Sequence, residues 1–391
     1  MEQDVVADIE NLRRLAENDG PIAVSAYIDN NLNRWRREQV AFAITGRTAT
    51  GKSTFINKIR NVTPADDGFA STGSGNTTVI PTLYRHPTND QITFYDLPGY
   101  ASTIFKKEDY INEMNIFDYH FIFILFSHVL SEDEIWLVGE LLKLGKPFAL
   151  VRTKIDIDID NAIADNKDRE MIIPEIRERI QIALIANPEL ADARRIFLIS
   201  SRNIELGEWS DLITYVGENI DGFKAQALLF SLDCFTKEIV ERKYQMLKKR
   251  REVVTVLAAS VAFVPLPGLD VAFDIALLIH EVNHYMSVFG VNPRKVNSLI
   301  GFDRSLLKCK DLLEPNVNMA LVLAAKIQIR LGVLFVTSVL SVILSLVGSV
   351  ISAASTAMSI YQFLGTMLHD VKHDALLIYE HIANHNADHR M

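Results

Sequence analysis

One run of residues has the types and the spacing needed to hold a phosphate. Gly46-Arg-Thr-Ala-Thr-Gly-Lys-Ser53 matches G-x-x-x-x-G-K-[ST], in which glycines let backbone N–H groups surround the anion. An apolar run over 40–45 precedes it and a helix is predicted over Thr54–Arg60, so a positive helix end faces the same loop. We expect Lys52 to reach the β- and γ-phosphates of a nucleotide and the Ser53 hydroxyl to bind Mg²⁺. The predicted phosphate contacts are Gly46, Arg47, Thr48, Ala49, Thr50, Gly51, Lys52, Ser53 and Thr54.

A second motif, Asp96-Leu-Pro-Gly99, follows the predicted strand Ile92–Tyr95. Such a sequence can be an ordinary turn, but at a strand end downstream of a phosphate loop we interpret it as D-x-x-G. Asp96 would then hold Mg²⁺ through water, and the Gly99 N–H would meet the γ-phosphate. A switch threonine that closes over the metal is expected between the two motifs, and Thr77 and Thr78 are both candidates. The predicted catalytic set is Lys52, Ser53, Thr77, Thr78 and Gly99, and the predicted metal ligands are Ser53, Thr77, Thr78 and Asp96.

A third motif, Thr153-Lys-Ile-Asp156, follows the apolar run Phe148–Val151 and bears on the choice of base. The Asp156 carboxylate could accept hydrogen bonds from N1–H and N2–H₂ of guanine, a pair of donors that adenine lacks. The Lys154 stem would pack on the ring. Thr153 stands where many motifs of this kind have Asn. The motif therefore predicts a guanine nucleotide.

The residues around the base site offer an alternative interpretation and a further set of contacts. Asp158 and Asp160 continue the alternation of acidic residues, so a solvated loop is the alternative interpretation of this segment. The position of the motif after a strand favours guanine. After the last predicted strand, backbone N–H groups of Ser200, Ser201 and Arg202 would complete the pocket at the guanine O6.

The residue after the D-x-x-G motif is Tyr100, at the position where small signalling GTPases carry the Gln that orients the attacking water. Arg47, inside the phosphate loop, resembles a built-in arginine finger, but at the second loop position we expect it to point away from the phosphates. Hydrolysis is therefore predicted to be slow until a second molecule, for example another copy of the chain, completes the site.

Alternating strands and helices must position these motifs. Short apolar runs predict buried strands at 40–45, 92–95, 121–126, 148–151 and 196–199, and helices such as 132–144 and 174–186 separate them. This order predicts an α/β domain over 38–225, with a mostly parallel sheet covered by helices on both faces.

The two ends of the chain read as helical. Two amphipathic helices are predicted in 1–37. No run typical of a β-strand is found in 226–391, whose composition is that of helices. Residues 331–368 carry no Asp, Glu, Lys or Arg, and are long enough either to cross a bilayer or to form a pair of buried helices. We favour buried helices, because the resemblance described below implies a helical domain.

Composition excludes some functions. The chain has 391 residues, a net charge of −9 and no basic module, so a nucleic-acid partner such as ribosomal RNA is not expected. Two cysteines make no disulfide framework, and no secretory signal is visible at the N-terminus. We expect a cytoplasmic protein. Glu2 stands where N-myristoylation requires Gly.

These motifs together resemble the immunity-related GTPases, the p47 interferon-inducible type. The resemblance extends from about residue 1 to about residue 385. It is carried by Gly46–Ser53, Arg85-His86-Pro87, Phe94–Gly99, Val151–Asp156, Leu198–Asn203 and Phe263–Asp270. Lys52 places the chain with the Lys-bearing effector-type members rather than with the regulatory members that have Met.

The resemblance implies a Ras-like P-loop GTPase domain with an all-α helical domain assembled from both chain ends. It also implies GTP-dependent self-assembly through the GTPase face, association with intracellular membranes, regulation by GTPases of the same family, and defence against intracellular pathogens. A GTP-gated scaffold or membrane-binding switch with negligible hydrolysis is the alternative. Without a lipidated Gly, the basic run Lys248–Arg251 beside the apolar stretch 253–269 is the candidate contact with anionic lipids.

Overall fold

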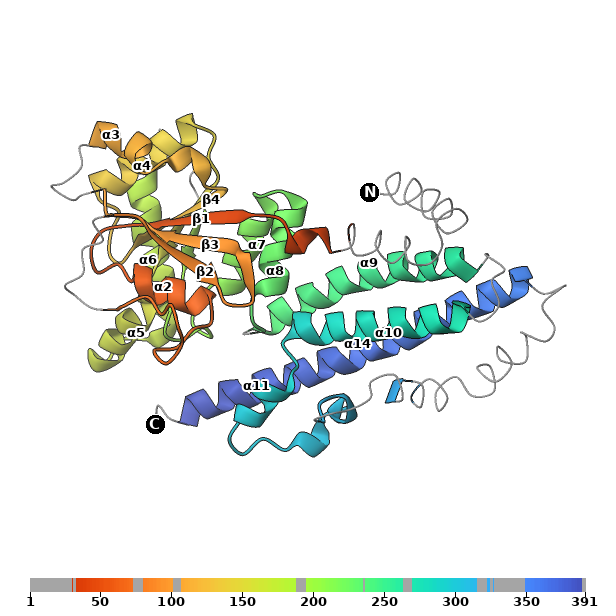
Figure 1. The fold of residues 1–391 in the computed structure, drawn as a ribbon. Coiled ribbons are helices and arrows are strands. Elements are labelled where there is room, and N and C mark those ends of the chain that lie inside the picture. The colour runs from red at the N-terminus through yellow and green to blue at the C-terminus, as the bar shows by residue number, and fades with distance from the viewer. Residues whose placement is uncertain are drawn as a thin grey trace. The chain divides into compact units, whose positions relative to one another are not determined.

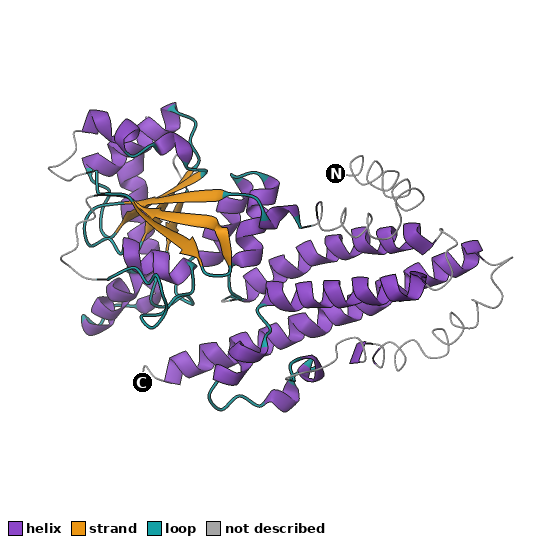
Figure 2. Cartoon of the chain, viewed as in Figure 1, coloured by secondary structure: helices purple, strands orange, loops and turns teal. Residues whose placement is uncertain are grey.

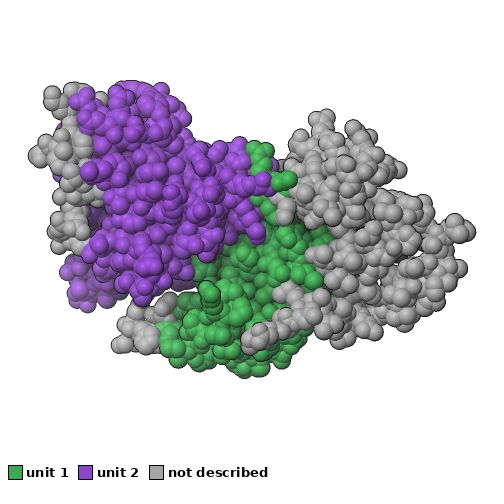
Figure 3. Space-filling model, in the orientation of Figure 1, with its two compact units in different colours: residues 1–34, 233–391 green, residues 35–232 purple. Residues whose placement is uncertain are grey.

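The chain forms two compact units (Figure 3). The computed structural model describes residues 30, 33–72, 80–100, 107–187, 195–234, 236–262, 269–314, 322–323, 326 and 349–388. One unit comprises residues 35–232, and the other comprises 1–34 with 233–391. The sequence placed these divisions at 37/38 and 225/226. Helix α8 (Gly222–Ser231) continues through the second of these, and the ring of its Phe230 packs edge-on against Trp35 with centroids 5.3 Å apart.

A six-stranded sheet is the centre of the first unit, in the order β2-β3-β1-β4-β5-β6. Only the pair β2–β3 is antiparallel among the strand pairs of the described residues. The strands are β1 (Val40–Thr45), β2 (Thr82–His86), β3 (Asn89–Asp96), β4 (Phe121–Phe126), β5 (Phe148–Arg152) and β6 (Ile196–Leu198). The mostly parallel α/β sheet that the sequence predicted is confirmed.

Helices cover both faces of the sheet (Figures 1 and 2). Alternate residues of β4 show this, because Ile122 and Ile124 lie in a core cluster with α4 residues such as Leu137, while Phe123 packs against Phe55 of α2 at 5.1 Å. All of β4 is buried for that reason. The helices are α2 (Lys52–Ile59), α3 (Lys107–Glu113), α4 (Glu132–Lys143), α5 (Ile155–Ala164), α6 (Arg169–Ile185), α7 (Trp209–Glu218) and α8.

Helix α6 begins earlier than the sequence predicted. We expected a start at Pro174, which suits the first turn of a helix. The structure begins the helix at Arg169, because the Asp168 side chain accepts a hydrogen bond from the Glu170 N–H at 3.0 Å and caps the end.

The second unit is helical. It contains α9 (Lys237–Ala262), α10 (Leu269–Phe289), the short α11 (Pro293–Ser298) and the long α14 (Ser349–Asp388), which packs along both α9 and α10 (Figure 1). Residues 349–368 of the uncharged stretch form the first half of α14, and 331–348 lie outside the described residues. Within the described ranges, no helix has the length and apolar character needed to cross a bilayer.

The basic run Lys248–Arg251 is not the lipid-facing patch that the sequence suggested. Arg250 is buried and its Nη2 lies 2.6 Å from Oε1 of Glu281, itself fully buried on α10. The Arg251 guanidinium lies over the Tyr361 ring of α14, 3.9 Å from its centroid. The prediction that all four residues are available to lipid was wrong, because Arg250 and Arg251 point into the packing between α9 and its neighbours. Lys248 is half-buried and Lys249 is exposed.

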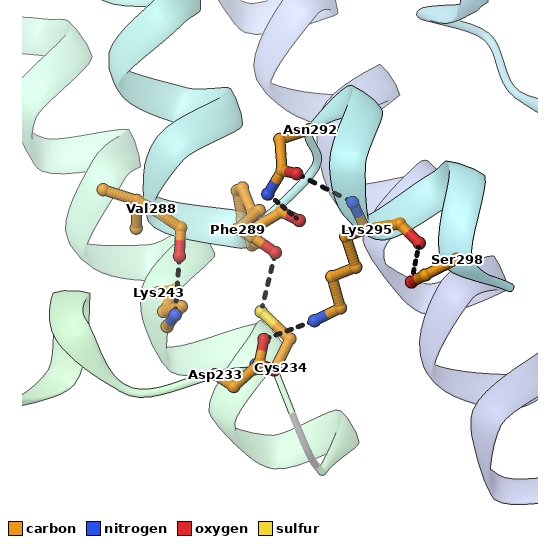
Figure 4. A network of polar contacts seen from close by, with 9 residues as sticks. Asp233, Cys234, Lys243, Val288, Phe289, Asn292, Lys295 and Ser298 are labelled. Carbon is orange, nitrogen blue, oxygen red and sulfur yellow. Dashed lines mark hydrogen bonds and ion pairs between the residues drawn. The ribbon is translucent and has the colours of Figure 1, made fainter. Parts of the chain in front are cut away.

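A polar network holds the first residues of this helical unit (Figure 4). Lys295 of α11 pairs with Asp233 at 2.5 Å, and the Cys234 thiol donates to the Phe289 carbonyl at 3.3 Å. The buried Lys243 ammonium donates to the Val288 carbonyl at 2.6 Å. The Lys295 charge holds the pKa of Asp233 low despite burial. The chain that follows α8 is thereby attached to the end of α10 and to α11.

Candidate nucleotide site

The phosphate loop runs from the end of β1 to the start of α2 (Figure 1). Its backbone has positive φ at Gly46 (146°), Ala49 (65°) and Gly51 (92°), which explains the glycines at both ends. The Lys52 ammonium donates to the Gly46 carbonyl at 2.9 Å, so its charge lies inside the loop. Ser53 and Thr54 follow in the first turn of α2. The residues that the motif singled out are therefore brought together.

The D-x-x-G segment lies directly against this loop. The Leu97 N–H donates to the Ile44 carbonyl at 2.9 Å, so the segment leaves the sheet beside β1. A Cβ placed on Gly99 would come within 3.2 Å of the Gly46 carbonyl oxygen, so a larger residue there would require the phosphate loop to shift by a few tenths of an ångström. The segment is therefore packed closely on the start of the phosphate loop.

Lys52 and Asp96 form the charged centre of the site. Burial lowers the pKa of Lys52, and the negative charge of Asp96 partly offsets that effect. Asp96 is buried at the end of β3, and Ser53 is half-buried on α2. A carboxylate and a hydroxyl are the oxygen donors that Mg²⁺ prefers, so this donor set fits the metal. Thr77 and Thr78, the candidate switch ligands, lie outside the described residues.

Thr153 connects the base-reading segment to the phosphate loop. Its side chain is buried, and its hydroxyl donates to the Thr50 carbonyl at 2.6 Å and lies 3.2 Å from the Phe126 carbonyl. Its own N–H donates to Phe126 at 2.9 Å. Residues 103 positions apart in the sequence are thus joined at one point.

The three aspartates of α5 have different environments. Asp156 is half-buried in the first turn, after Lys154, whose left-handed backbone (φ 65°) ends the preceding loop. Asp158 forms an ion pair with Arg152 at 2.7 Å, and Asp160 is exposed. The solvated-loop interpretation therefore does not describe Asp158, and Asp156 is the carboxylate placed next to the loop end.

The segment Ser200–Arg202 forms a tight turn. The Ser200 hydroxyl accepts hydrogen bonds from the N–H groups of Arg202 at 3.2 Å and Asn203 at 2.9 Å, and the Trp209 indole donates to its carbonyl at 2.9 Å. The Ser200 N–H donates to the Leu206 carbonyl at 3.3 Å and the Arg202 N–H is engaged within the turn, so the prediction that these two N–H groups bind the guanine O6 was wrong. The Arg202 side chain is exposed. The Ser201 hydroxyl is buried and has no hydrogen-bond partner among the described residues.

Tyr100 does not face the phosphate loop. It is buried in the core cluster, and its hydroxyl donates to Glu134 of α4 at 2.7 Å. Burial and the Glu134 charge raise the pKa of Tyr100 far above its usual value, so the phenol stays neutral. Arg47 is exposed. Neither position supplies a side chain that could orient an attacking water.

Sequence reasoning missed two contributors to this site. The Tyr110 hydroxyl donates to the Pro98 carbonyl at 2.8 Å and contacts the Thr45 hydroxyl at 2.8 Å, which holds the D-x-x-G turn against the end of β1. No local pattern around Tyr110 signals this role. The second contributor is Arg152, whose charge next to the Thr153–Asp156 motif was visible but whose partner was not.

Comparison with known proteins agrees with these motifs. A family model described as Interferon-inducible GTPase (IIGP) matches residues 3–379. The chain is 28% identical over 299 residues to Interferon-inducible GTPase 5 of Rattus norvegicus, covering 75% of this chain and 63% of that protein. It is 29% identical over 301 residues to Interferon-inducible GTPase 1 of Mus musculus, covering 75% and 71%.

Similarity to solved structures is lower. The structure of an oligomerised bacterial dynamin pair aligns with a TM-score of 0.36 and 11% identity, covering 98% of this chain and 77% of that one. Era in complex with MgGDPNP and 16S ribosomal RNA aligns with a TM-score of 0.32 and 20% identity, covering 47% and 57%. Since the family model spans nearly the whole chain and the phosphate, D-x-x-G and T-K-x-D motifs converge at one sheet edge, the chain belongs to the interferon-inducible GTPase family.

Proposed function

We propose that this chain binds and hydrolyses GTP at the site formed by the phosphate loop, the D-x-x-G turn and the Thr153–Asp156 segment. The observation that carries the proposal is the hydrogen bond from the Thr153 hydroxyl to the Thr50 carbonyl, at 2.6 Å. It sets the base-reading segment at a fixed position relative to the phosphate loop. A nucleotide needs both parts at once.

Each residue has a defined part in this proposal. The Lys52 charge would offset the β- and γ-phosphates, and the Gly99 N–H would donate to the γ-phosphate. Asp156 would accept from N1–H and N2–H₂ of guanine, and a neutral Ser201 hydroxyl beside the pocket would complete its polar lining. Ser53 and Asp96 would hold Mg²⁺, with Thr77 or Thr78, and the metal supplies charge neutralisation at the phosphates.

Self-assembly would complete the catalytic site. Tyr100 is buried and bonded to Glu134, so position 100 offers no group that orients water. We therefore propose slow turnover by the single chain and faster turnover when GTPase faces of two copies meet. By analogy with the family, we propose that the GTP-bound assembly acts at intracellular membranes in cell-autonomous defence, from a cytoplasmic pool, and that regulatory GTPases of the same family control it.

The same burial of Tyr100 supports a second candidate, a GTP-gated scaffold or membrane-binding switch with negligible hydrolysis. Specific activity against protein concentration separates the two. A cooperative GTPase gains activity per molecule as concentration rises, whereas a scaffold stays flat near zero. Turnover measured with and without liposomes tests the membrane part of the proposal.

Base choice is tested by Asp156→Asn. The change turns an acceptor into a donor opposite the guanine amino group, so we expect weaker GTP binding and better binding of xanthosine triphosphate. A competition assay measures both affinities on one preparation. GTP affinity equal to wild type in this variant would contradict the guanine assignment.

A further inference from the structure

Arg152 holds the base-reading segment from two sides. It is the last residue of β5 and its side chain is only 4% exposed. One guanidinium nitrogen, Nη2, lies 2.7 Å from Oδ2 of Asp158, and the other, Nη1, donates to the Thr153 carbonyl. A planar guanidinium can make both contacts at once, which a lysine ammonium on a flexible stem cannot reproduce.

The position of Asp158 on α5 determines what this contact does. Asp156 is the second residue of α5 and Asp158 the fourth. Residues two apart on an α-helix project about 200° apart around its axis. Holding Asp158 against Arg152 therefore turns Asp156 to the other side of the first turn. If α5 were rotated about its axis by the angle of one residue, Asp158 would no longer meet Arg152 and Asp156 would no longer point to the same side.

The rest of the segment is anchored at other points. The Ile155 side chain is fully buried, and its N–H reaches the Ile199 carbonyl at 3.4 Å. Thr153 is attached to the phosphate loop through Thr50. These contacts fix the start of α5. The ion pair acts past that start, at the turn that carries the base-reading carboxylate.

We propose that Arg152 and Asp158 are positioning residues for base recognition, whose ion pair sets the rotation of the first turn of α5 and directs Asp156 at guanine. The inference rests on the proposed GTP-binding function. It predicts that the pair controls how well the site distinguishes bases, while phosphate binding by the Lys52 loop stays intact.

The test compares two nucleotides on the full-length chain. GDP and inosine diphosphate carry the same phosphates, but inosine lacks the 2-amino group that Asp156 would contact. We expect wild type to prefer GDP. In Asp158→Asn, GDP affinity should fall about tenfold, the worth of one charge-assisted hydrogen bond, while inosine diphosphate, which offers Asp156 only its N1–H, should lose less affinity. Competition against a fluorescent guanine nucleotide gives both constants. Their ratio is taken within one variant, so partial unfolding affects both alike.

Two further variants make the test specific. Asp165→Asn removes an exposed carboxylate at the end of the same helix, 3.9 Å from Lys167, and should leave the ratio unchanged. The double variant Arg152→Met with Asp158→Leu replaces the pair by apolar groups, which commonly preserves stability. We expect it to lose the GDP preference as well.

The outcomes separate the two levels of the proposal. If wild type prefers GDP and both Asp158→Asn and the double variant keep the wild-type ratio, the pair has no positioning role and the inference is wrong. ADP is measured in the same competition assay. If wild type itself binds ADP as well as GDP, the proposed guanine site is wrong and the inference fails with it.

Discussion

Replacing Thr153 by valine removes the hydroxyl that joins the base-reading segment to the phosphate loop and keeps the branched shape of the side chain. The hydroxyl donates to the Thr50 carbonyl at 2.6 Å in a site where Thr153 is 1% exposed. The net worth of such a hydrogen bond is about 1 kcal/mol. Because the shape is kept, a cavity adds little to this cost.

Two measurements follow for Thr153→Val. The free energy of unfolding should fall by about 1 kcal/mol, which lowers the melting temperature of a domain of this size by about 2–4 °C. GDP affinity should fall by about fivefold if the same bond aligns the two nucleotide loops. Chemical denaturation and titration with a fluorescent guanine nucleotide measure the two effects on one sample.

Thr153→Ser is the matched control, because it keeps the hydroxyl and removes only a methyl group. We expect its GDP affinity to stay near wild type. If Thr153→Val also bound GDP with wild-type affinity, the bond to Thr50 would be structural only, and the observation that carries the proposed function would lose its force.

Further expectations concern the phosphate loop, the helical unit and pH. Lys52→Ala should abolish tight GTP binding, because the γ-phosphate loses its main counter-charge; calorimetric affinity within about threefold of wild type would contradict the loop assignment. Glu281→Gln leaves a buried guanidinium without its charged partner and should lower the free energy of unfolding by about 3–5 kcal/mol, whereas exposed Lys249→Gln should change it by under about 0.5 kcal/mol in the same denaturation assay. The His120 ring accepts the Ala41 N–H at 3.0 Å through Nδ1, and burial with nearby lysines lowers the pKa of His120 below its usual 6.5. The stabilisation that neutral His120 gives to the folded state is therefore present above pH 6.5 and is lost as the pH falls through the folded pKa. We expect His120→Gln to make the free energy of unfolding depend less on pH on the acid side. A pH dependence parallel to that of wild type would refute this.

The correction at Lys248–Arg251 changes how membrane binding should be tested. Arg250 and Arg251 are packed against Glu281 and Tyr361, so replacing the whole run would damage the helical unit. Lys248 and Lys249 are the appropriate targets for a liposome assay. Loss of binding by these two alone, with unchanged stability, would restore a lipid role for the exposed part of the run.

The sequence by itself determined five of the six strands, the phosphate loop and the class of the chain. It missed β2 (Thr82–His86), because that strand is largely exposed and carries no apolar run. Gly46 and Gly51 adopt backbone angles that favour glycine, and apolar runs such as Phe121–Phe126 can only be satisfied by burial on both faces. These signals are local, because they depend on backbone freedom and on hydrophobic periodicity within a few residues. The family resemblance rests on the same local segments.

Only the tertiary structure decided which partner each polar side chain meets. Asp156 and Asp158 look alike in the sequence, and the ion pair with Arg152 separates them. Tyr100 occupies a position that suggests catalysis, yet its hydroxyl is bound to Glu134, a residue of another helix. Charge and residue type can be seen in the sequence, but the direction in which each side chain points depends on how α5 and α4 pack on the sheet. That packing joins groups far apart in sequence, so no local pattern encodes it.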